Sequence, residues 1–174
     1  MKLKKQAILF ICLIIALGLL LLLNTLRKPQ TATLPRTSQI TMESIKLQFL
    51  PGEEFFVTLN LDSKDKEVAA ADIVVYFNPQ FLKVLEVKTG KFFTNYPINT
   101  TYRDHIKLSG IASFNGESLT FPKGKATLGQ IKFQAQNRSG NTIISFDSRK
   151  TIVATSGQDI LDKTQLNKLA ISIQ

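Results

Sequence analysis

Side chains that build catalytic and metal sites are scarce in this sequence. Its 174 residues include one histidine, one cysteine and no tryptophan. One histidine and no carboxylate pair at a catalytic spacing leave no Ser/His/Asp or Cys/His arrangement to assemble. The pairs Asp62-x-x-Asp65 and Asp159-x-x-Asp162 each offer two oxygens, whereas calcium takes about six to eight. We therefore predict no catalytic residue, no metal or cofactor held by the chain itself, and a protein that is not an enzyme.

The lone cysteine, Cys12, excludes a disulfide within the chain. It lies inside an apolar run from Ala7 to Leu23, where a free cysteine behaves as a small hydrophobic residue. Whatever folds outside this run must therefore be stabilised by its core alone.

The apolar run predicts a membrane anchor. It holds 17 residues without a charge, which is about the shortest helix that crosses a bilayer. A cleaved signal peptide fits less well, because no small-x-small site follows the run directly. Lysines 2, 4 and 5 precede it, and the positive-inside rule then places the N-terminus in the cytoplasm. We predict a basic tail over 1–6, a single transmembrane helix over 7–26, and the bulk of the chain outside the cytoplasm at the cell surface.

The net charge of +9 does not predict nucleic-acid binding. Five of the basic residues flank the apolar run, where anionic lipid headgroups attract them. Residues 38–174 carry 16 basic and 13 acidic side chains, with no basic run or stripe. The predicted partners are the membrane and a protein or polysaccharide, and not a nucleic acid.

Beyond the anchor, the sequence changes character twice. Residues 27–38, RKPQTATLPRTS, are rich in Pro, Thr and Ser and predict an extended linker. From residue 39 to 174 the apolar period is two, as in Phe55 to Asp62, where apolar and polar residues alternate. Between 40 and 49 the alternation changes parity, which fits either a bulge near Glu43-Ser44 or a break between two strands. Short strands separated by Gly, Pro and Asn turns predict an all-β sandwich.

One stretch is more specific than this general pattern. In DIVVYFNPQFLKVLEVKTG, residues 72–90, Pro79 ends one strand and forces a turn before the next. This stretch resembles the cohesin family, in which an Asp-aromatic strand runs into an Asn-Pro or Asp-Pro turn and then a Leu-rich strand that ends in Gly. LPGEEFFVTLNLDS (50–63), GKATLGQIKFQAQ (124–136) and RKTIVATSGQDIL (149–161) are similar to other parts of the family pattern, in the same order.

The resemblance implies a nine-stranded jelly-roll β-sandwich over 39–174 that binds a protein partner. In cohesins one sheet face docks the partner, typically a dockerin, which brings its own calcium. Asp72 matches a partner-facing position of the family, whereas Ala70 stands where a second polar contact is common. We expect the partner-binding residues to be Asp72, Val74, Tyr76, His105, Lys107 and Ser109.

Alternatives remain at this point. One alternative is that another segment of the same chain covers Val74 and Tyr76. Asp72 would then be an ordinary solvated charge. A carbohydrate-binding module on a similar jelly roll would need exposed rings, and the candidates are Phe92, Phe93, Tyr96 and Tyr102. A structural subunit of a pilus-like assembly ranks last, since the acidic residue and processing site at the start of a pilin helix are missing.

Overall fold

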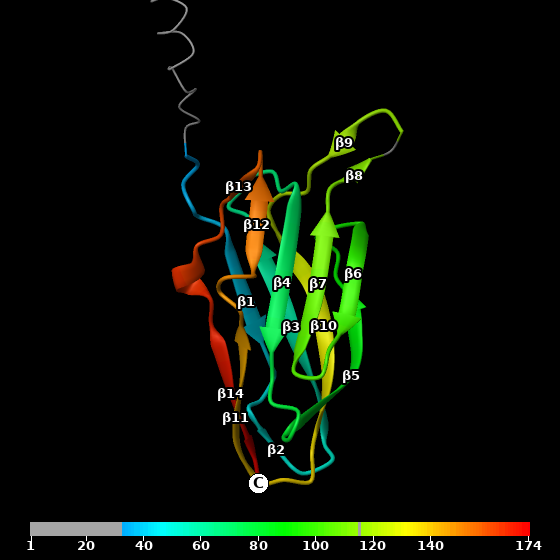
Figure 1. Ribbon diagram of the computed structural model, residues 1–174, viewed down its shortest axis with the longest axis vertical. Coiled ribbons are helices and arrows are strands. Elements are labelled where there is room, and N and C mark those ends of the chain that lie inside the picture. The colour runs from blue at the N-terminus through cyan, green and yellow to red at the C-terminus, as the bar shows by residue number, and fades with distance from the viewer. Residues whose placement is uncertain (1–32, 115) are drawn as a thin grey trace, which may run out of the picture. The chain divides into compact units, whose positions relative to one another are not determined.

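The computed structural model describes residues 33–114 and 116–174 (Figure 1). Almost everywhere in these residues, the segments in which apolar and polar residues alternate form β-strands. The predicted tail, the predicted anchor and residues 27–32 of the predicted linker lie outside the described residues. Among the residues that are described, no helix has the length and apolarity to cross a membrane. The residues from Leu34 to Gln174 form one compact unit.

The described residues of this unit form fourteen strand segments and one short 3-10 helix, rather than the nine strands expected. In chain order they are β1 (Gln39–Glu43), β2 (Gln48–Phe49), β3 (Glu54–Asp62), β4 (Ala70–Tyr76), β5 (Leu82–Thr89), β6 (Asn95–Thr101), β7 (His105–Ile111), β8 (Ser113–Phe114), β9 (Leu119–Thr120), β10 (Lys125–Ala135), β11 (Gly140–Phe146), β12 (Ile152–Thr155), β13 (Gln158–Asp159), η1 (Lys163–Gln165) and β14 (Lys168–Ile173).

Two sheets form the sandwich. The smaller has the order β1-β3-β10-β5. The larger contains β13-β12-β4-β11-β14-β2, and β7 and then β6 continue it from the other edge of β4. Between the named strands the pairing is antiparallel except for β14 with β2, and an isolated parallel bridge joins Ser38 to Leu161. Both β12 and β11 pair with β4, β12 along its start and β11 along its end.

The core lies between the sheets and is filled by alternate residues of the long strands. Phe133 of β10 is fully buried, and its ring centroid lies 5.7 Å from that of Phe55 and 5.5 Å from that of Phe77. Aromatic rings bury large apolar areas and prefer offset or edge contacts of this kind. This cluster supplies the stabilisation that disulfides give to many small domains.

Three local expectations are resolved by the strand pattern. The parity change after Glu43 is a break between strands and not a bulge, because β1 belongs to the smaller sheet and β2 to the larger. Residues 34–38 are part of the compact unit rather than linker, since the amides of Thr37 and Ser38 both donate to the carbonyl of Ile160 at 3.0 Å. Residues 95–101, which lie between predicted strands, form the edge strand β6.

Candidate protein-docking surface

The outer faces of the two sheets differ in chemistry. On the smaller sheet, polar side chains such as Thr58, Asn60 and Gln130 dominate. The exposed ring of Phe56 has the Lys132 ammonium 6.0 Å from its centroid, and that lysine forms an ion pair with Glu54. A solvated face of this kind offers a partner little apolar area to bury.

On the outer face of the larger sheet, small and apolar side chains lie beside a few polar ones where β12, β4, β7 and β6 lie side by side, in that order from left to right at the front of Figure 1. Residues that oppose each other in an antiparallel ladder share a face. We call this surface the docking face and define it by outward residues from the four strands: Ala70, Asp72, Tyr76, Ile98, His105, Lys107, Ser109, Ile111, Ile152 and Ala154.

Two cross-strand rows form the centre of the docking face. In one, Asp72 is flanked by Ile152 of β12 and by Ser109 of β7, which in turn opposes Ile98. The Ser109 hydroxyl donates a hydrogen bond to the Asp72 carboxylate, and the serine is itself buried. Ser109 therefore orients Asp72 rather than offering a contact of its own.

The second row is built from small and apolar residues. Ala70 opposes Ala154 on one side and Ile111 on the other. The methyl side chains of Ala70 and Ala154 project little from the sheet, and Ile111 beside them is only partly exposed. The backbone of a partner can therefore approach the sheet closely here.

Val74 lies on the outer side of β4 but is only 3% exposed, so the expectation that it contacts a partner is wrong. The connection from β11 to β12 lies against it. The amide of Asp147 donates to the carbonyl of Val74 at 2.9 Å, and the amide of Val74 donates to Thr151 Oγ1 at 3.2 Å. The alternative in which the chain covers its own face is thus correct for Val74, and this connection forms one border of the docking face.

Tyr76 remains partly exposed beside that border. Lys150 Nζ donates to its hydroxyl at 3.3 Å, and this contact raises the pKa of Lys150. The ring of His105 lies 5.3 Å from the Tyr76 ring and 4.4 Å from the nearly parallel Tyr102 ring. The His105 imidazole also pairs with Asp104 at 2.8 Å, and this hydrogen bond lowers the pKa of Asp104. The lower end of the face is therefore an aromatic cluster with basic neighbours.

Replacing Thr151 by valine tests how the border is held. The threonine is fully buried and its hydroxyl bonds both backbone groups of Val74, while valine keeps nearly the same volume. Leaving a buried amide without a partner costs about 1–3 kcal/mol. We expect Thr151→Val to lower the free energy of unfolding by about 1–2 kcal/mol in urea titrations, with Thr155→Val, which is less buried, as the control. Equal stability of Thr151→Val and wild type would contradict the assigned hydrogen bonds.

The candidate sugar-binding rings are not assembled into an exposed platform. Phe92 and Phe93 are buried in the core, against the expectation for them. Tyr96 is half-buried, and this burial raises its pKa. Tyr102 is 47% exposed, but its ring is stacked on His105.

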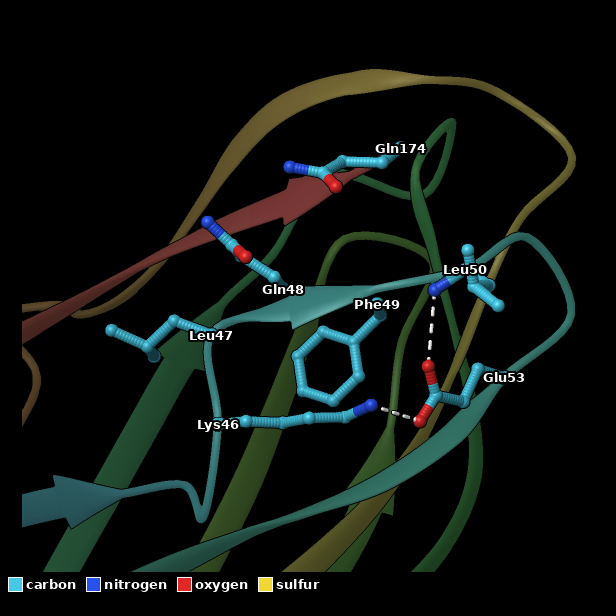
Figure 2. Close-up of a pocket in the computed structure, with 7 residues that line it drawn as sticks. All are labelled: Lys46, Leu47, Gln48, Phe49, Leu50, Glu53 and Gln174. Carbon is cyan, nitrogen blue, oxygen red and sulfur yellow. Dashed lines mark hydrogen bonds and ion pairs between the residues drawn. The ribbon is translucent and has the colours of Figure 1, made fainter.

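A separate hollow of about 720 Å³ lies beside β2, at the lower end of the sandwich in Figure 1, and is drawn in Figure 2. The Lys46 ammonium and the Glu53 carboxylate on its wall form an ion pair, and Lys46 lowers the pKa of Glu53. The Phe49 ring is buried and stacked on Phe55, with 3.9 Å between centroids. Because its charges are paired and its ring is buried, this hollow offers less for recognition than the docking face.

Comparison with known proteins agrees with this architecture. The family model described as "Cohesin domain" matches residues 45–173. Comparison with curated protein sequences gives no match.

Solved cohesins have the same fold. The third ScaC cohesin of Acetivibrio cellulolyticus, solved in complex with the ScaB dockerin, is 13% identical with a TM-score of 0.63, over 79% of this chain and 99% of that one. The OlpC cohesin of Clostridium thermocellum, also in a complex with a dockerin, is 16% identical with a TM-score of 0.62, over 83% and 99%. A non-cellulosomal cohesin of the archaeon Archaeoglobus fulgidus is 12% identical with a TM-score of 0.57, over 79% and 91%. The match over most of the described unit confirms the resemblance, and the chain belongs to the cohesin domain family.

Proposed function

We propose that this chain is a membrane-anchored binding protein whose docking face holds a dockerin-like protein partner. Cohesin domains are non-catalytic protein-binding modules, which makes the chain a binding protein and not an enzyme. The observation that carries the proposal is the central pair of rows, in which apolar and small side chains flank a carboxylate held by a buried serine. Such a surface combines an apolar centre with one fixed polar contact, as protein interfaces do.

The side chains of the docking face indicate which kind of partner it would bind. The row of Ala70, Ala154 and Ile111 favours a helix whose own apolar stripe can lie close to the sheet. The aromatic cluster below it has Lys107 and Lys150 nearby, so acidic or polar groups of the partner would meet it. The ScaC and OlpC cohesins were both solved in complexes with dockerins, which supports a partner of this class. Calcium, if the interaction needs it, would be held by the partner.

Anchoring rests on the sequence of residues 7–26. With the N-terminus in the cytoplasm, the compact unit would lie outside the membrane, at the cell surface. In the proposed jelly-roll sandwich, β11 and β12 together take the place of a single strand beside β4. The docking face beside them would be open to a soluble partner.

The proposal is tested by titration calorimetry of the chain with a set of calcium-loaded dockerin domains, with and without a chelator. For the dockerin that binds best, Asp72→Arg with Tyr76→Ala is expected to weaken binding at least about tenfold, since each tenfold loss is about 1.4 kcal/mol and the pair removes one fixed polar contact and one ring. Glu54→Arg with Phe56→Ala on the polar face is the matched control and should leave affinity unchanged. Equal weakening by both variants, or binding by no dockerin, would contradict the proposal.

A further inference from the structure

We propose that the hairpin of β8 and β9 rests on the lipid surface of the membrane that anchors the chain, through Phe114 and Leu119. This inference rests on the anchoring part of the proposed function and does not depend on which partner the docking face holds.

The hairpin exposes apolar area without an obvious use within the domain. Phe114 is 64% exposed and Leu119 is 57% exposed. The two residues oppose each other in the ladder, so their side chains share one face of the hairpin. Two adjacent large apolar side chains at the tip of a projecting hairpin are costly in water and suited to insertion into a lipid interface.

The hairpin projects from the end of the sandwich at which the described chain begins (Figure 1). Hydrogen bonds place both segments there. The amide of Leu34 donates to the Gln158 side chain of β13, and the amide of Ala69, just before β4, donates to the carbonyl of Ala154 near the end of β12. At this same end the amide of Ala112, just before the hairpin, donates to the carbonyl of Ala69, and the amide of Val68 donates to Pro122, just after it.

Chain length brings this end close to the bilayer. Residues 27–33 are all that lies between the predicted end of the anchor and Leu34. Fully extended, this stretch reaches about 25 Å at most. With the proposed anchor over 7–26, this tether would keep Leu34 within that distance of the bilayer, and the hairpin projects from the same end of the sandwich as Leu34. The hollow of Figure 2 lies at the other end, and the exposed Ile45 directly precedes Lys46 on the wall of this hollow.

Charge at the hairpin end is mixed, so lipid headgroups would not be recognised by electrostatics. Lys64, Lys66 and Lys123 are balanced there by Asp65, Glu67 and Glu117, the last of which lies in the hairpin itself. Apolar insertion should therefore persist at high salt, unlike the binding of a basic patch.

The test uses the absence of tryptophan from the chain. Full-length Leu119→Trp and, as the control at the opposite end, Ile45→Trp are reconstituted separately into vesicles of phosphatidylcholine and phosphatidylglycerol at 3:1. Brominated phosphatidylcholine is expected to quench the fluorescence of the Leu119→Trp variant by about half or more, in low and high salt, and that of the Ile45→Trp variant by less than about a tenth. Adding Phe114→Ser to Leu119→Trp should reduce the quenching at least about twofold, which separates native insertion from the preference of tryptophan itself.

Several outcomes overturn the proposal. Equal quenching of the two variants, or none in either, would show that the hairpin does not meet lipid. Failure of the full chain to float with vesicles would remove the anchor and the hairpin contact together, while dockerin binding in solution stays intact. The double variant Phe114→Ser with Leu119→Ser should keep dockerin affinity within about twofold, and a larger loss would assign the hairpin to the protein partner instead.

Discussion

Gly90→Ala is expected to lower the free energy of unfolding by about 3 kcal/mol or more, and in many preparations to prevent folding. A Cβ atom at position 90 would lie 2.0 Å from the carbonyl oxygen of Thr127 and 2.6 Å from the carbonyl carbon of Leu128. Both are backbone atoms of β10, so no side-chain rotation can relieve the clash. The amide of Gly90 also donates to the Leu128 carbonyl at 2.7 Å, and separating the strands would break this hydrogen bond.

Gly157→Ala is the matched control for this prediction. Gly157 has a φ of +74°, but a Cβ atom added there would have nothing within 4 Å, so alanine meets backbone strain without a clash. We expect a cost of about 1 kcal/mol. Urea denaturation of a fragment spanning residues 33–174, followed by circular dichroism, compares the two variants. Similar midpoints for both would show that the close approach of Gly90 to β10 is not what requires a glycine.

The parts of the fold that the sequence predicted are those controlled by local pattern. Alternation places Val57, Leu59 and Leu61 inside the sandwich, and all three are buried. Pro79 stops β4 near the predicted position. In β6, by contrast, NYPINTT carries a proline and few apolar residues, and only Tyr96 and Ile98 are partly buried. An edge strand that covers little of the core needs few apolar residues, so its sequence shows no clear alternation from which a strand could be predicted.

Contacts between distant segments account for the errors at the site. Val74 has the parity of an exposed residue, and the threonine that helps cover it lies 77 positions later. Phe93 sits in a connection that alternation leaves unassigned, yet its ring packs directly over Gly110. A Cβ atom on that glycine would lie 2.2 Å from the ring. The available signal was Gly110 inside β7, because glycine in a strand marks a close approach by another group.

The departure at Ala70 becomes informative once its neighbours are known. In the sequence alone, alanine at position 70 means only that one polar contact with a partner is missing. In the structure Ala154 and Ile111 lie on either side of Ala70, so the three residues form an apolar row with Ala70 as its floor. The docking face therefore has an apolar row at its centre, and the difference from a polar docking face is not limited to residue 70. Its partner should be selected by how closely an apolar helix can approach this floor.

Ala70→Arg is consequently the change with the largest expected effect on binding. A long charged side chain on the floor of the row would hold a partner helix away from the sheet and would have to lose its water on docking. We expect at least about a 100-fold loss of dockerin affinity, which corresponds to about 3 kcal/mol. Titration calorimetry measures the loss, and the melting temperature should change little because Ala70 is only partly buried.

Thr58→Arg is the matched control, since Thr58 is also a partly buried outward residue in the middle of a strand, but on the polar sheet. It should bind dockerin as wild type does. Ala70→Ser serves as the conservative variant and should stay within about threefold, because a hydroxyl adds little bulk to the floor of the row. If Ala70→Arg kept its affinity while Asp72→Arg lost it, the partner would lie over the row of Asp72 and not over that of Ala70. Close packing on the alanine floor would then not be how this domain recognises its partner.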